Sequence, residues 1–221
     1  MTVLHLADEG EAADLAAFLS RLLHYDRSAA VRLQAAGTAL AVFGRPPSFE
    51  VLAIRAARLA KPYENGLDVT LDVTVSAGEL LEAVDESAAT AAVPGAVTGP
   101  PWAGVLPPRG GWRAEPGLPA PGELRGLVAA SVAEFRSRTE ELAPQARTRA
   151  ALDQVGREIW SRTVGETGLQ VRAVHAAQSL GFLRGGEQSL LSSGAWLRLR
   201  TRYGSVAVRR AGVGALGISV R

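Results

Sequence analysis

One segment near the end of the chain combines residue types that can bind an anion. Trp196, Arg198, Arg200 and Arg202 alternate with less polar residues, and Arg209 follows in the next run. Alternation places side chains on a single face of a β-strand. Guanidinium groups bind phosphates, and an aromatic ring offers a surface on which a base can stack. The segment therefore predicts a binding face for nucleic acid or for another anionic partner, such as an acidic protein surface.

A helix before this segment extends the hypothesis. A capping box at residues 167–170 starts a predicted helix that continues to Leu180. Three predicted helices followed by a two-stranded hairpin have the order of a winged helix, in which this last helix would enter the major groove of DNA. The residues presented to the groove would be Arg172, His175, Gln178 and Ser179. The alternative is an edge hairpin that uses arginine to prevent edge pairing, with Trp196 lying over a helix.

Other motifs predict neither catalysis nor metal binding. The chain has no cysteine, which excludes disulfides and thiolate sites. His5, His24 and His175 are isolated, so a zinc site would have to be assembled by the fold. Residues 212–217 match G-x-G-x-x-G, but too few residues follow to form the helix and acidic partner that a dinucleotide requires. We expect no cofactor and a non-enzymatic protein; a catalytic triad dispersed along the chain keeps an enzyme as an alternative.

Composition and charge are those of a soluble protein with one basic half. Of the 221 residues, 47% are hydrophobic and 21% are charged. Residues 1–112 carry a net charge of −5, and residues 113–221 carry +7. Arginine-rich composition is also what a GC-rich genome encodes, so charge alone does not establish an anionic partner. Acidic residues near the N-terminus argue against a signal peptide. We expect a cytoplasmic protein with no membrane partner, and a homo-oligomer is compatible with the sequence.

The clearest secondary-structure signal is the alternation of apolar and polar residues at 67–75, which predicts a half-buried antiparallel strand. Before it we predict a strand at 2–6, a helix from Glu9 to about residue 25, a hairpin at 30–43 and a strand at 49–59. After it, a capping box at Ser76 starts a short helix. This order favours a four- or five-stranded antiparallel sheet with helices on one face.

Residues 91–121 differ in composition from their surroundings. Eight of the twelve prolines lie between Pro94 and Pro121, together with Trp102 and Trp112. One interpretation is an ordered loop whose aromatic residues pin it to the core. The other is a proline-rich recognition segment.

Taken together, the patterns predict an α+β protein. Its parts would be an N-terminal antiparallel sheet region with flanking helices (1–90), a Pro/Gly-rich connection (91–121) and a basic segment of three helices closed by a hairpin (122–221). The hairpin, at 195–201 and 205–209, either stays with its own helices or joins the first sheet. The leading function is a non-enzymatic regulatory or nucleic-acid-associated protein. The alternatives are a protein-interaction or scaffold module, and a small-molecule enzyme or binder with a site between sheet and helices.

Overall fold

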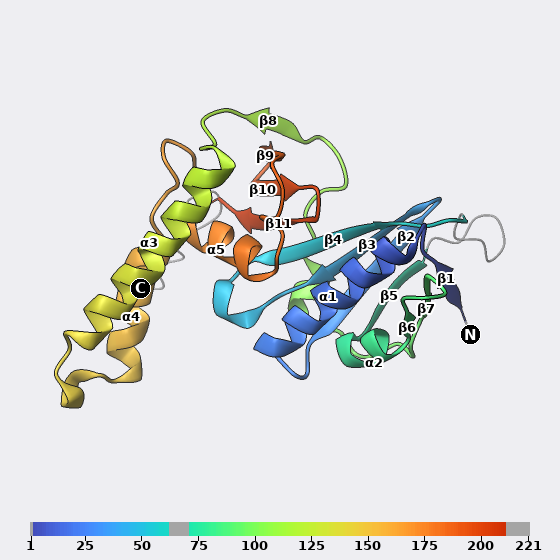
Figure 1. Cartoon of the computed structure of the whole chain (residues 1–221), viewed down its shortest axis with the longest axis horizontal. Helices are drawn as coiled ribbons and strands as arrows, with labels where there is room; N and C mark the ends of the chain where they lie inside the picture. The colour runs from blue at the N-terminus through green and yellow to red at the C-terminus, as the bar shows by residue number, and fades with distance from the viewer. Residues whose placement is uncertain (1, 62–70, 211–221) are drawn as a thin grey trace, which may run out of the picture.

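The computed structural model describes residues 2–61 and 71–210, and its architecture is mixed α+β, as predicted (Figure 1). The helices in these ranges are α1 (Glu9–Tyr25), α2 (Ala77–Glu82), α3 (Pro121–Glu140), α4 (Arg149–Trp160) and α5 (Val171–Ser179). Short 3₁₀ turns are η1 (Pro47–Phe49), η2 (Pro101–Gly104) and η3 (Pro144–Ala146).

The strands form two antiparallel sheets. They are β1 (Val3–His5), β2 (Ala30–Ala36), β3 (Ala39–Gly44), β4 (Leu52–Arg58), β5 (Leu71–Ser76), β6 (Val84–Asp85), β7 (Thr90–Ala92), β8 (Arg113–Glu115), β9 (Gln188–Ser193), β10 (Trp196–Thr201) and β11 (Gly204–Arg209). Within the described residues, an eight-stranded sheet has the order β5-β2-β3-β4-β11-β10-β9-β8, and a three-stranded sheet has the order β1-β7-β6. The predicted first strand therefore pairs with β7 and not with the main sheet.

Helix α1 begins and ends where the sequence predicts. The Asp8 carboxylate accepts a hydrogen bond of 2.8 Å from the backbone N–H of Glu11, which is an N-cap. Leu15, Phe18 and Leu22 are buried along one side of the helix. Because these positions are three and four residues apart, they form a single apolar stripe. The stripe anchors α1 on the main sheet, which it crosses in Figure 1.

The strand predicted at 67–75 is described from Leu71 onward as β5; residues 67–70, like the turn at 65–66 and the glycine motif at 212–217, lie outside the described residues. β5 pairs antiparallel with β2, with Val75 opposite Val31 and Asp72 opposite Gln34. Val75 is buried and Asp72 is exposed. The described part is thus the half-buried antiparallel strand that alternation predicts, at one end of the sheet.

The final hairpin, β10 and β11, joins the first sheet. β11 pairs with β4, with Val206 opposite Ala53, and β10 pairs on its other side with β9. Both hairpin strands therefore have neighbours on both sides, so the edge-hairpin alternative was wrong. The hairpin is also an internal part of a large sheet, and the winged-helix layout, with a wing beside three helices, is not what the strands form. Alternation did not predict β9, whose sequence is QSLLSS.

The two faces of the eight-stranded sheet differ. One face buries Val31, Val42 and Leu199 in the main core with α1 and α5. The opposite face carries a smaller cluster formed by Phe43, Leu52, Ile54 and Ala207. The proline-rich segment crosses this second face, behind the sheet in Figure 1, and its Trp102 packs on the cluster. For Trp102 the interpretation of an aromatic residue that pins an ordered loop is confirmed.

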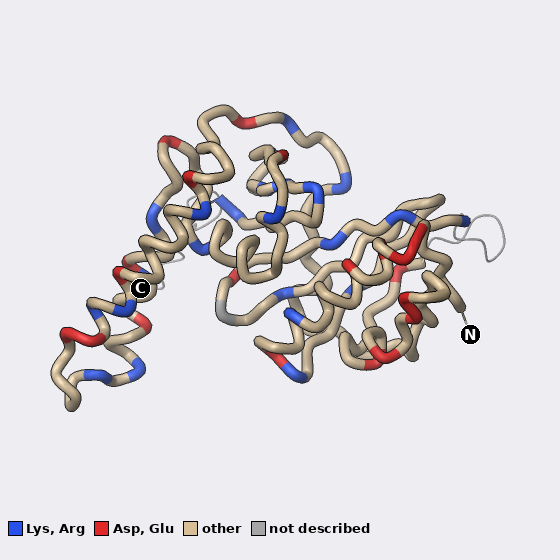
Figure 2. The backbone as a smooth tube through the Cα atoms, viewed as in Figure 1, with Lys and Arg blue, Asp and Glu red and all other residues tan. Residues whose placement is uncertain are grey.

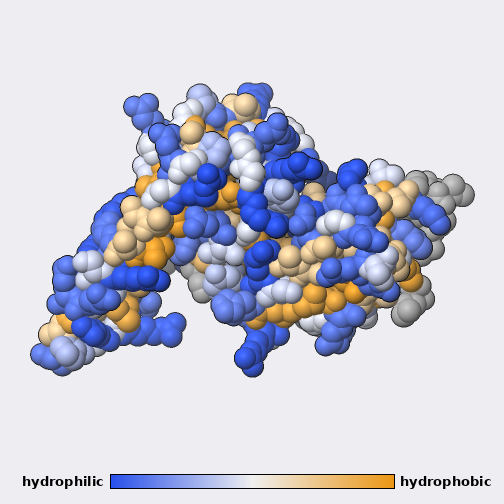
Figure 3. Space-filling model, in the orientation of Figure 1, coloured by the Kyte–Doolittle hydropathy of each residue, from blue (hydrophilic) through white to orange (hydrophobic). Residues whose placement is uncertain are grey.

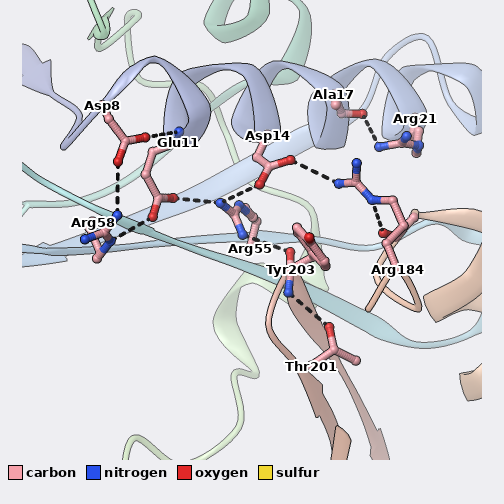
Figure 4. Close-up of polar contacts among 11 residues, drawn as sticks. Asp8, Glu11, Asp14, Ala17, Arg21, Arg55, Arg58, Arg184, Thr201 and Tyr203 are labelled. Atoms are coloured by element: carbon pink, nitrogen blue, oxygen red, sulfur yellow. Dashed lines mark hydrogen bonds and ion pairs between the residues drawn. The ribbon is translucent and has the colours of Figure 1, made fainter. Parts of the chain in front are cut away.

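A buried arginine connects the parts of the sheet that lie far apart in sequence (Figure 4). Arg55 of β4 is 4% exposed and points to the main-core face. Its Nη2 lies 2.7 Å from a carboxylate oxygen of Glu11, and its Nη1 donates a 3.0 Å hydrogen bond to the carbonyl of Tyr203. One guanidinium thus holds α1, β4 and the turn between β10 and β11 together.

Candidate functional site

The alternation in β10 places Trp196, Arg198 and Arg200 on the face opposite the main core, because the two intervening leucines are buried in that core. In the pairing with β11, Trp196 lies opposite Arg209 and Arg200 lies opposite Ser205. Residues opposite each other on paired strands share a face. We call this surface the arginine face; its members are Trp196, Arg198, Arg200 and Arg209.

Arg202 is not part of this face. β10 ends at Thr201, so Arg202 lies in the exposed turn that follows. Its guanidinium carbon is 6.0 Å from the centre of the Tyr203 ring. The sequence prediction of three guanidiniums on one strand face is therefore corrected to two from β10 and one, Arg209, from β11.

Aromatic rings and a hydroxyl hold two of these guanidiniums in place. The guanidinium carbon of Arg209 is 5.4 Å from the centre of the Trp196 ring, and that of Arg198 is 5.6 Å from the centre of the Trp112 ring. Nε of Arg198 also donates a 2.8 Å hydrogen bond to Oγ of Ser205. In the described part of the chain, both Nη nitrogens of Arg198 have no hydrogen-bond partner. They are available to an added acceptor.

Among the described residues, no carboxylate compensates the charge of the arginine face. Residues 188–209, which form β9 to β11, contain four arginines and no Asp or Glu; Figure 2 shows basic and no acidic segments along β10 and β11. No carboxylate of the described residues forms an ion pair with Arg198, Arg200, Arg202 or Arg209, whereas the next residue, Arg210, lies 2.6 Å from Glu115. Burial lowers the pKa of Arg198, and the charge of Arg200 lowers it further. An anion would relieve this repulsion.

The residues predicted on the groove-reading helix lie elsewhere. Arg172 of α5 forms an ion pair with Glu50, and His175 packs between Phe49 and Trp160, with ring centres 5.1 Å and 4.6 Å away. Gln178 is exposed. The partners of α5 come from η1 and α4 and cover the face that would have to enter a DNA groove. The structure therefore does not bring these three residues together with the arginine face.

The residues that contact Arg172 and His175 also line a cleft between α4 and the rest of the fold. The cleft is visible as a hollow beside the α3–α4 hairpin in Figure 3. Its volume is ≈ 870 Å³. Aromatic rings line it together with charges of both signs; the lining includes Tyr25, Phe49, Trp160, His175, Arg172, Glu50 and Asp153. Burial lowers the pKa of His175. We call it the helix cleft.

A second, smaller depression lies on the arginine-face side of the sheet, beneath Pro107 and Pro108. Its volume is ≈ 250 Å³. The floor consists largely of alanines of β2, β3 and β4, and Arg109 and Arg198 stand in its wall. We call it the alanine groove.

Residues 2–61 and 71–210 hold neither a metal-binding cluster of side chains nor a helix that could cross a membrane. These residues contain no group of three or more His, Asp or Glu side chains that could hold a metal ion. None of the helices described there is long and apolar enough to cross a membrane.

Two family models match the chain. The first, described as Domain of unknown function (DUF8010), matches residues 1–104, and the second, described as Domain of unknown function (DUF8185), matches residues 107–213. No curated protein matches it. The boundary falls in the loop that covers the arginine-face side of the sheet. Because β4 belongs to the first matched segment and β11 to the second, their pairing makes one sheet from both.

Several residues of this region are not predicted by the sequence patterns. The sequence places Trp112 only in a loop, and its contact with Arg198 joins residues far apart in the chain. Ser205 carried no signal at all, although it orients Arg198. The alanines of the groove could have been noticed, because small residues recur at alternate positions 39 and 41 of a predicted strand. Whether these alanines lie on the same face of the sheet as Arg198 depends on the pairing of β4 with β11.

Proposed function

We propose that this protein is a non-enzymatic, nucleic-acid-associated protein that binds a single strand on the arginine face. The observation that carries the proposal is the clustering of Arg198, Arg200 and Arg209 on a surface without carboxylates, in the described part of the chain. Elsewhere, arginines such as Arg55, Arg162 and Arg172 are paired with acidic residues. A polyanion would supply the missing counter-charge, releasing its own counterions as it binds.

The form of the surface favours a single strand. A strand face with guanidiniums and indole rings resembles the stacking surfaces and basic channels on which unpaired bases and phosphates bind. The structure does not favour duplex reading by α5, because Arg172 pairs with Glu50 and His175 packs against Phe49 and Trp160. We also propose a regulatory role. The proposed location is the cytoplasm, where nucleic acid is present.

The proposal is tested by fluorescence anisotropy with labelled single-stranded DNA and RNA of mixed sequence and with a duplex of the same sequence. The decisive variant is Arg200→Glu with Arg209→Glu, because both side chains are exposed. Arg198 is left intact, since it is partly buried and a reversed charge at this position would disturb the sheet. A loss of affinity of more than tenfold is expected from two reversed phosphate contacts.

The matched control is Arg27→Glu with Arg136→Glu, which changes the net charge equally at two exposed arginines that form no ion pair in the described residues. This control should bind almost as well as the wild-type protein. Equal losses in both double variants would show that net charge and not the arginine face is responsible, and would contradict the proposal.

A small-molecule enzyme or binder is the second candidate, favoured by the helix cleft. His175 and Glu50 both line this cleft, which lies between the main body and the helices. Crystals soaked with a fragment library would test it. Fragments seated against His175 would support this candidate, and a cleft that stays empty through the library would count against it.

A further inference from the structure

The alanine groove arises from small side chains at facing positions of the sheet. Ala41 of β3 is opposite both Gln34 of β2 and Ala56 of β4. A methyl group reaches a short distance from the strand, so neighbouring alanines leave a depression where larger side chains would fill the surface. Pro107 and Pro108 line one side of that depression. Because the covering loop is fixed elsewhere, it does not collapse into the space.

Two contacts fix the loop. Trp102 packs on the cluster that includes Phe43 and Ile54. Arg32 donates a hydrogen bond to the carbonyl of Ala103 and binds Asp72 through Nε at 2.7 Å and Nη2 at 3.0 Å. The groove is therefore formed before any ligand arrives, which reduces the ordering that binding requires.

The charged side chains that line the groove are both arginines. Arg109 and Arg198 line it, and none of the described residues that line it is acidic. Asp72, the carboxylate nearby, binds Arg32 and accepts a 3.1 Å hydrogen bond from Gln34, and the charge of Arg109 helps to lower its pKa. Ser205 holds Arg198 through Nε and leaves both Nη nitrogens of that guanidinium without a partner among the described residues. An arginine with free Nη nitrogens matches the two oxygens of a carboxylate.

We infer that the alanine groove binds a small organic carboxylate whose apolar body lies on the alanine floor and whose carboxylate is bound by Arg198 and Arg109. The apolar floor favours a hydrocarbon body over a bare inorganic anion. The volume of ≈ 250 Å³ is below that of pockets for drug-sized molecules, so the ligand has about the size of benzoate or hexanoate. This site goes beyond the proposed function: it shares Arg198 with the arginine face but needs neither Arg200 nor Arg209.

The inference is tested with benzoate and with benzamide, its neutral counterpart, in NMR titrations of the full-length ¹⁵N-labelled protein. Benzoate should shift the backbone amides of Ala41, Ala56 and Arg198. Benzamide should bind more weakly than benzoate by a factor of about ten or more. Equal affinities for the two probes, or no shifts at these amides with benzoate, would overturn the inference.

Two variants and one control variant locate the site. Ala56→Phe places a ring over the groove from an exposed position and should abolish the benzoate shifts; Ala114→Phe, at another exposed strand alanine outside the groove, should leave them unchanged. Arg198→Gln should weaken benzoate about tenfold and leave benzamide unchanged. Benzoate binding that survives in Ala56→Phe with wild-type affinity would refute the location. All three variants should keep the dispersed amide spectrum of the folded protein.

Different variants test the binding of benzoate in the groove and the binding of oligonucleotides on the arginine face. Ala56→Phe should retain oligonucleotide binding, and Arg200→Glu with Arg209→Glu should retain benzoate binding. Loss of both ligands in either variant would show that the groove is not the separate site inferred here.

Discussion

Nη2 of Arg55 lies 2.7 Å from Oε2 of Glu11, and this ion pair is nearly excluded from water: the side chains are 5% and 14% exposed. Arg55 stands on a strand of the first matched segment, and its Nη1 binds the Tyr203 carbonyl in the second. The same carboxylate group of Glu11 also binds Arg58, whose side chain is 72% exposed. Arg55 and Arg58 of β4 thus share Glu11 as their partner, although Arg55 is buried and Arg58 is exposed.

Replacing Arg55 with methionine should destabilise the fold strongly. The variant leaves Glu11 close to the core without its buried partner, and breaking a buried ion pair in this way costs about 3 to 5 kcal/mol. Urea denaturation measures the change. Arg58→Met removes an exposed partner of the same carboxylate and should change the urea midpoint little. Similar midpoints for the two variants would contradict the importance of burial.

Unfolding of the intact chain should be a single cooperative transition. The pairing of β4 with β11 and the contacts of Arg55 join residues 1–104 to residues 107–213, so neither segment keeps its contacts when the other unfolds. Tryptophan fluorescence and far-UV circular dichroism should give the same midpoint in urea. Two separate midpoints would mean that the matched segments are independent domains.

The strand start at Gly204 should tolerate no side chain. Its φ is 156°, and a Cβ placed there would lie 2.5 Å from the ring of Phe182, which is buried and stacks on Phe18. Gly204→Ala should therefore cost about 1 to 3 kcal/mol from overpacking. Gly126→Ala, in α3 with open space around it, should instead stabilise by about 0.5 to 1 kcal/mol. Thermal denaturation compares them; a neutral Gly204→Ala would contradict this packing.

Stability should fall with acid partly because of His175. Burial lowers the pKa of this imidazole below its usual 6.5, so the unfolded chain binds a proton that the folded protein does not. The contribution is therefore present above about pH 6.5 and is lost as the pH falls through the lowered pKa. Wild-type protein should lose more stability than His175→Phe between about pH 7 and about pH 5. Parallel urea midpoints across this range would contradict the effect.

Local patterns predicted what depends on neighbours in sequence. The Asp8 cap and the apolar stripe of α1 gave its limits, and alternation gave the described part of β5 and both strands of the hairpin. The short strands β6 and β7 and the strand β9 lack a clear alternation. The order of the large sheet depends on the pairing of β4 with β11, between residues far apart in the chain, which no local pattern encodes.

For the candidate site too, local patterns predict some features, and others depend on contacts between residues far apart in the chain. The common face of Trp196, Arg198 and Arg200 follows from the period of a strand, and the structure has it. The predicted role of Arg172 and His175 assumed that the polar face of α5 is open. Glu50 and Trp160 cover that face, and both come from other elements. Such contacts appear only once the chain is folded.

The most direct test of the arginine face is the salt dependence of single-stranded DNA binding, measured by fluorescence anisotropy from about 50 to about 300 mM salt. With three or four phosphate contacts, the logarithm of the binding constant should fall against the logarithm of salt concentration with a slope of about −2 to −3. In Arg200→Glu with Arg209→Glu the slope should become shallower by more than 1, while the Arg27→Glu and Arg136→Glu control keeps the wild-type slope. Absence of binding at low salt, or a slope that these two arginines do not change, would contradict the account.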